Sequence, residues 1–144
     1  MGTLPPKLQD LTEMLASFPE DERINILIDY GEKLAAVPED VAVKPYPDEN
    51  KVSYCESDAY VWSRQMPDNS LKFYFAVENP QGLSAKALSA ILDKTLSGEL
   101  PQDIVNIDDS VLPKIFGRGL STRKQMGLAG IVNMVKREAE KYLK

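Results

Sequence analysis

Residues 59–77 of the chain read AYVWSRQMPDNSLKFYFAV. Both ends of this stretch, residues 59–66 and 71–77, are rich in the β-branched and aromatic side chains that strands favour. The Pro-Asp-Asn-Ser segment between them consists of residues that favour turns. The stretch therefore predicts a β-hairpin.

The second half of this hairpin also predicts which face is buried. Large apolar residues, Leu71, Phe73, Phe75 and Val77, lie on one face and alternate with Lys72, Tyr74 and Ala76 on the other. Such alternation predicts that one face packs on a core and that the other is at least partly exposed to solvent. A similar apolar run at residues 52–55 adds a further strand. We therefore expect a small antiparallel sheet of about three strands with helices on one face, an α+β fold.

Helical spacing of apolar residues dominates the rest of the chain. Leucines recur at positions 4, 8, 11 and 15 behind Pro5 and Pro6, which predicts a first amphipathic helix. Ser17 and Glu20 have capping-box spacing and open a second helix, whose stripe is Ile24, Leu27, Ile28, Gly31, Leu34 and Ala35. Residues 37–50, with three prolines, predict an irregular connection.

Helix signals also follow the hairpin. Ser84 is a candidate cap for a helix that ends before Gly98, and Pro101 and Pro113 each suggest the start of a short helical turn. A last helix carries a stripe formed by Leu128, Ile131, Val132, Val135, Ala139 and Tyr142.

Composition limits the classes of function. A length of 144 residues suits one domain, which we expect over residues 1–144. The net charge of −5 argues against a nucleic-acid partner, and no apolar run is long enough to span a membrane. The chain has one cysteine, which fits a reducing compartment, and we expect a cytoplasmic protein.

Cys55 is that single cysteine, and the chain contains no histidine. These two facts exclude an internal disulfide, a CxxC pair and a Cys-His nucleophile, and they leave no ordinary zinc ligand set, so no metal site is expected. The thiol is either an inert small hydrophobe or a group that reacts with a partner's chemistry. Its acidic neighbours Glu56 and Asp58 disfavour a further negative charge nearby.

Basic residues gather before and within the start of the last helix. Arg118, Arg123 and Lys124 lie around Gly119-Leu120-Ser121. Cations oppose the positive end of a helix dipole, so this helix does not itself favour them. They are either an ordinary solvated surface or a site for an anion or for a partner's acidic side chains.

Three segments of the chain match motifs of one known protein family. Cys55-Glu56-Ser57-Asp58-Ala59-Tyr60 resembles the C-x-S-x-V-[WY] segment of the SufE family of sulfur-acceptor proteins, and residues 100–105 resemble its T-P-x-[DE]-I-[VL] element. Residues 120–128 resemble its closing L-[ST]-P-S-R-x-x-G-[LFM] motif, with Lys124 aligned on the family arginine and Arg123 one position earlier. The chain departs from the family at Tyr54, where a glycine is usual, and at residues 79–82, where D-S-D-A is common.

The resemblance implies an α+β domain that is also similar to the IscU-type scaffold fold. It implies that the protein stimulates a cysteine desulfurase and receives sulfur from it as a persulfide on Cys55. The protein then passes this sulfur to an iron–sulfur scaffold. It places partner contacts at Glu56, Ser57, Asp58, Arg123 and Lys124. It also assigns pyridoxal phosphate to the desulfurase, so this chain is expected to need no cofactor. The chain is then an accessory protein without turnover of its own.

Three other functions stay open at this point. The chain is alternatively a binding or scaffold module with an inert Cys55, a sulfur carrier for another thiolation pathway, or a thiol hydrolase. The last of these lacks an obvious base, because there is no histidine.

Overall fold

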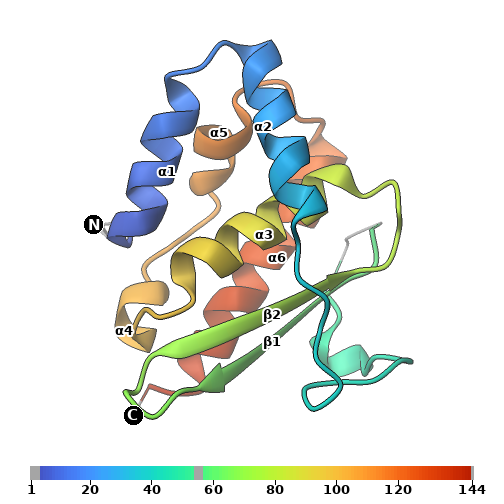
Figure 1. Ribbon diagram of the computed structural model, residues 1–144, viewed down its shortest axis with the longest axis vertical. Coiled ribbons are helices and arrows are strands. Elements are labelled where there is room, and N and C mark those ends of the chain that lie inside the picture. The colour runs from blue at the N-terminus through green and yellow to red at the C-terminus, as the bar shows by residue number, and fades with distance from the viewer. Residues whose placement is uncertain (1–3, 54–56, 144) are drawn as a thin grey trace.

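The computed structural model describes residues 4–53 and 57–143. In these residues the elements follow the chain as α1 Pro6–Ala16, α2 Glu20–Glu32, the 3-10 turn η1 Asp48–Asn50, β1 Ala59–Gln65, β2 Leu71–Val77, α3 Leu83–Leu96, α4 Pro101–Ile104, α5 Val111–Phe116 and α6 Thr122–Glu140. The two strands run along one side of the molecule, and α1, α2 and α5 gather at the other (Figure 1). The expected α+β fold is confirmed.

The predicted hairpin is present. β1 and β2 are antiparallel, with Val61 opposite Phe75 and Ser63 opposite Phe73. The turn is closed by a 2.8 Å hydrogen bond from the Met66 N–H to the Ser70 carbonyl, and Asn69 takes a positive φ of 73°. Asparagine tolerates this left-handed conformation better than most residues.

The third strand expected at residues 52–55 is not a full strand in the described part of the chain. Lys51 forms an isolated antiparallel bridge with Tyr60, and the Val52 N–H donates a 2.8 Å hydrogen bond to the Ala59 carbonyl. Residues 54 and 55 lie outside the described residues. Within the described chain the sheet therefore has two strands, β1 and β2.

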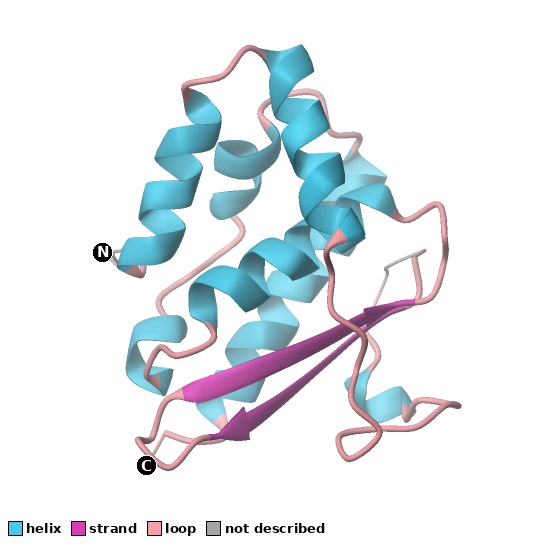
Figure 2. Cartoon of the chain, in the orientation of Figure 1, coloured by secondary structure: helices cyan, strands magenta, loops and turns pink. Residues whose placement is uncertain are grey.

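Helices cover one face of this sheet, as predicted. α3 packs on β2 and α6 packs on β1 (Figure 2). The core between them contains fully buried side chains from both layers, namely Phe73, Leu88, Ile91, Leu92, Ile131, Val132 and Val135. The stripe predicted for the last helix is thus the face that α6 packs inward, except that Tyr142 lies beyond the end of α6 and is only partly buried.

The opposite face of β1 is also covered, although not by a helix. Tyr46, from the irregular connection between α2 and β1, packs edge-on against Tyr60 at 5.2 Å and Trp62 at 5.0 Å between ring centroids. Both strand side chains are buried in consequence. The outward residues of β2, Lys72, Tyr74 and Ala76, stay partly exposed, as the alternation predicts.

Three of the predicted helix starts are wrong. Ser17 ends α1, where its hydroxyl donates to the Met14 carbonyl at 2.6 Å, and Pro19 precedes α2. Ser84 lies inside α3, which begins after Gly82, and Pro113 is the third residue of α5. A hydroxyl near a helix start caps it only where the backbone enters the helix at that residue, and spacing alone does not fix that position.

The stripe predicted for α2 is only partly buried. Leu27 and Gly31 are buried, but Ile24 remains 50% exposed. α2 packs mainly on α3, and Gly31 sits there against the Ala87 backbone. A helix that meets one neighbour along a narrow line leaves the margins of its apolar stripe in solvent. None of the described helices has the length and apolarity needed to cross a membrane.

Candidate functional site

Residues from three separate parts of the chain line one pocket beside the end of the hairpin. Its volume is about 310 Å³, and we call it the site pocket. The residues that line it are Ser57, Asn79, Gln81, Gly82, Leu83, Ser84, Ala85, Arg123, Lys124, Gly127 and Leu128. The segment after Cys55, the start of α3 and the start of α6 therefore meet here.

The hairpin ladder holds one side of this pocket. Beyond the ends of the strands, the Glu78 N–H donates to the Asp58 carbonyl and the Asn79 N–H donates to the Ser57 carbonyl, each at 3.1 Å. Asp58 has a positive φ of 52°, which turns the chain at the start of β1. We call residues 57–59 the second stem, because they follow the segment that carries Cys55.

The first stem, residues 51–53, is held in two ways. It joins the second stem through the hydrogen bond between Val52 and Ala59, and it joins β1 through the bridge between Lys51 and Tyr60. It also packs on the middle of α6, where the Ser53 carbonyl lies against Gly130. Both sides of the segment that carries Cys55 are therefore fixed to the fold.

The start of α6 supplies the cationic wall of the pocket. Ser121 is the N-cap, and its side-chain oxygen accepts a 3.2 Å hydrogen bond from the Lys124 N–H. The cap fixes the first turn, from which the exposed residues Arg123 and Lys124 reach the pocket. α3 also begins at this pocket, so the positive ends of two helix dipoles add to two cationic side chains. This environment favours a negatively charged group.

The sequence-predicted site residues have different outcomes. Cys55 and Glu56 lie outside the described residues. Ser57, Arg123 and Lys124 line the same pocket.

Asp58 does not line the site pocket in the described structure and instead pairs with Lys51 at 3.4 Å. The hydrogen bond from Lys51 to this carboxylate raises the pKa of the lysine. Arg118 lies in a separate pocket with Asp109 and Leu120, so the basic cluster seen in the sequence is divided.

Sequence reasoning missed the turn at residues 79–82. The Gln81 N–H donates to the Asn79 side-chain oxygen at 2.9 Å, and the Gly82 N–H donates to the Asn79 carbonyl at the same distance. This turn places Gly82 and Leu83 in the pocket wall. The Asn-Pro-Gln-Gly sequence is itself a turn signal that could have located it.

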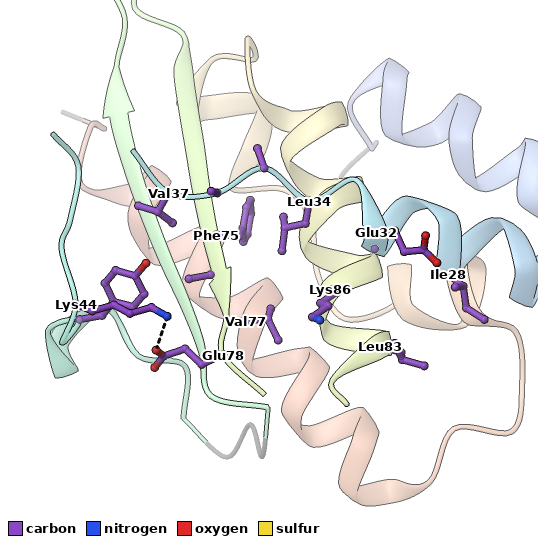
Figure 3. Close-up of a pocket in the computed structure, with 15 residues that line it drawn as sticks. Ile28, Glu32, Leu34, Val37, Lys44, Phe75, Val77, Glu78, Leu83 and Lys86 are labelled. Carbon is purple, nitrogen blue, oxygen red and sulfur yellow. Dashed lines mark ion pairs between the residues drawn. The ribbon is translucent and has the colours of Figure 1, made fainter. Parts of the chain in front are cut away.

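A second groove adjoins the site pocket at Leu83, which lines both and is 53% exposed. The groove has a volume of about 510 Å³ and lies among α2, the end of β2 and the start of α3 (Figure 3). Most of the residues that line it are apolar, among them Ile28, Leu34, Phe75 and Val77. Lys44 and Glu78 form an ion pair of 3.6 Å at its rim.

Comparison with known structures establishes the fold. A solution structure of a protein described as hypothetical, from Thermus thermophilus, superposes with a TM-score of 0.75 at 22% identity, and the match covers 97% of this chain and 98% of that one. The two proteins therefore share the same arrangement of helices and hairpin.

Comparison of sequences identifies the family. The chain is 24% identical over 137 residues to the cysteine desulfuration protein SufE of Plasmodium falciparum (isolate 3D7), a match that covers 92% of this chain and 53% of that protein. The chain therefore spans about half the length of this relative. The model of the SufE family, described as an Fe-S metabolism associated domain, matches residues 9–139, and the chain belongs to that family.

Proposed function

We propose that this protein is a sulfur acceptor of iron–sulfur metabolism. Its Cys55 takes sulfur from a persulfide on a pyridoxal-phosphate-dependent cysteine desulfurase. The protein thereby stimulates that enzyme and delivers the sulfur to an iron–sulfur assembly scaffold. Pyridoxal phosphate belongs to the desulfurase. The family match and the name of the Plasmodium relative support a role in this metabolism.

The observation that carries the proposal is the convergence at the site pocket. The two stems that flank the Cys55 segment are fixed to α3 and α6, and the pocket beside them contains Arg123 and Lys124. Gly127 and Leu128, which belong to the same sequence motif as these cations, line the same pocket. A reactive sulfur anion carried on this segment would be close to a cationic, partly enclosed environment.

The proposed step is a thiol exchange without net oxidation. The Cys55 thiolate attacks the sulfane sulfur of the desulfurase persulfide, R–S–SH. A new bond forms between the Cys55 sulfur and the sulfane sulfur, and the old sulfur–sulfur bond breaks. The desulfurase cysteine leaves as a thiolate, and the persulfide proton stays on the transferred sulfur.

The chain's own residues have to favour the anionic forms in this exchange. There is no histidine in the chain to act as a base. We infer that Arg123, Lys124 and the starts of α3 and α6 stabilise the thiolate before transfer and, once the new persulfide has lost its proton to solvent, the persulfide anion after it, since nearby cations and helix N-termini favour sulfur anions. The acidic groups next to Cys55 oppose this effect, because like charges nearby disfavour a further anion.

Mass spectrometry tests the proposal directly. The protein is incubated with cysteine and each cysteine desulfurase of the same organism and is then treated with an alkylating reagent. Its intact mass is then measured. A gain of one sulfur atom between the protein and the alkyl group supports sulfur acceptance, and it can only be on Cys55 because the chain has no other cysteine. No gain with any desulfurase would contradict it.

We also expect Cys55 to be shielded in the free protein and to become reactive when the desulfurase docks. A persulfide left exposed would be lost to other thiols, and the acidic neighbours disfavour an activated thiolate. The measurement is the alkylation rate of Cys55 with and without a desulfurase in which the active-site cysteine has been replaced by serine. Alkylation as fast as that of a small-molecule thiol at the same pH, without acceleration by the desulfurase, would refute this expectation.

A further inference from the structure

Gly82 lies in contact with the second stem. A Cβ built on Gly82 would lie 2.6 Å from the Ser57 Oγ, 2.7 Å from the Ser57 Cβ and 3.1 Å from the Val77 Cγ1. Carbon atoms in proteins do not approach this closely, because close-packed interiors leave no room for such overlap. Any larger residue at position 82 therefore requires Ser57 or the start of α3 to shift, which changes how the second stem lies against this helix.

Gly130 has the same relation to the first stem. A Cβ built there would lie 2.8 Å from the Ser53 carbonyl oxygen and 2.8 Å from the Val52 Cγ1. Gly130 is in the interior of α6, where glycine is less favourable than alanine. Helix propensity does not explain a glycine here, but the close approach of the Ser53 backbone does.

The two contacts act on opposite sides of the same short segment. Ser53 precedes residues 54–56 and Ser57 follows them. Hydrogen bonds already tie each stem to the hairpin, through Val52 to Ala59 and through Asn79 to Ser57. These bonds fix which residue each stem pairs with, whereas the glycine contacts limit how closely each stem lies against α3 and α6.

We propose that Gly82 and Gly130 are positioning residues for Cys55. By lacking a Cβ, they let the two stems rest directly on the start of α3 and the middle of α6, and the placement of these two stems limits the positions that the segment between them can give to the thiol. The inference rests on the proposed function, in which the position of this thiol limits transfer. It adds two residues on separate helices that do not take part in the exchange itself.

The sharpest test is Gly82→Ala with rescue at its contact. The added methyl group shifts Ser57 relative to the start of α3, so we expect faster alkylation of Cys55 by iodoacetamide and sulfur acceptance slowed by about tenfold, since small misplacements of reacting groups carry penalties of this size or more. The double variant Gly82→Ala/Ser57→Gly removes both clashing Ser57 atoms. The alkylation and sulfur-acceptance rates of this double variant should return to within about twofold of those of the single variant Ser57→Gly. The single variant is the reference because it shows the effect of losing the Ser57 side chain itself.

Gly130→Ala provides an independent second test. Asn133→Ala is its control, because Asn133 is an exposed residue on the same helix and an alanine there changes helix propensity without touching the stem. We expect Gly130→Ala to change the alkylation and sulfur-acceptance rates in the same directions as Gly82→Ala, and Asn133→Ala to leave both unchanged. Urea unfolding curves for all variants show which of them remain folded.

The outcomes separate this inference from the proposed function. If folded Gly82→Ala and Gly130→Ala proteins keep both rates within about twofold of the parent, or if Ser57→Gly fails to rescue Gly82→Ala, the positioning role is overturned. If the parent accepts no sulfur but its alkylation rate responds to Gly82→Ala and recovers in the double variant, the proposed function fails and the control of Cys55 by these glycines stands. Should Gly82→Ala not fold, Gly130→Ala against Asn133→Ala decides the question.

Discussion

Cys55→Ser is expected to leave the fold intact and to abolish sulfur acceptance. The hydroxyl is nearly the same size as the thiol, but its much higher pKa prevents it from exchanging with a persulfide at neutral pH. Because the chain has no other cysteine, no second thiol can take over the role. The measurement is sulfur gain by intact mass after incubation with desulfurase and cysteine, together with the rate of sulfide release.

Two controls make this result specific to the sulfur atom. Circular dichroism and urea unfolding should match those of the parent, and the serine variant should still bind the desulfurase in a pull-down, because the residues around the site pocket are unchanged. Stimulation of persulfide turnover retained by Cys55→Ser would remove the carrier role and favour a module that acts only by docking.

The sequence predicts best those features that depend on neighbouring residues. The hairpin follows from alternation across residues 71–77 and a Pro-Asp-Asn-Ser turn, and both are properties of adjacent positions. The buried face of α6 follows from the helical spacing of its apolar residues, which places them on the side that packs on the sheet. Tyr46 covers Tyr60 and Trp62 from a distant connection, and no local pattern indicates which strand face such a connection will cross.

The helix starts show the limit of the same reasoning. Ser17 has the spacing of a capping residue, yet Pro19 precedes the first turn of α2 and Ser17 bonds back to α1. Which hydroxyl caps a helix depends on the angle at which the chain enters it, and this is set by packing with other elements. Local propensity therefore places the helices approximately but not their first residues.

The candidate site rests on a different kind of argument. Ser57 and the pair Arg123 and Lys124 are far apart in the sequence, and it was the order of the family-like motifs, not spacing, that linked them before the structure placed them in one pocket. Gly82 and Gly130 gave no comparable signal. A glycine that accommodates a close backbone or side-chain contact is distinguishable from other glycines only when its neighbour is known.

Reversing the charges of Arg123 and Lys124 together should slow sulfur transfer strongly. If these residues orient the desulfurase or hold the incoming persulfide, Arg123→Asp/Lys124→Asp should cost about 2 kcal/mol or more, roughly 30-fold in rate, the scale for charge pairs desolvated at an interface. Rising salt should slow docking of the parent protein and affect the variant less. Transfer rates measured at several salt concentrations test both expectations.

The helix dipole makes this prediction separable from a loss of stability. Asp at the start of α6 interacts favourably with the positive end of the dipole, so the double variant should unfold at the same temperature as the parent or higher. Lys7→Asp/Lys114→Asp is the matched control, because both lysines are exposed, lie outside the site pocket and change the net charge by the same amount. Slower transfer only in the Arg123 and Lys124 variant, without lower thermal stability, identifies a binding role. Rates within about twofold of the parent in both single variants and the double variant would instead mark the pair as an ordinary solvated surface, whose charges contribute little.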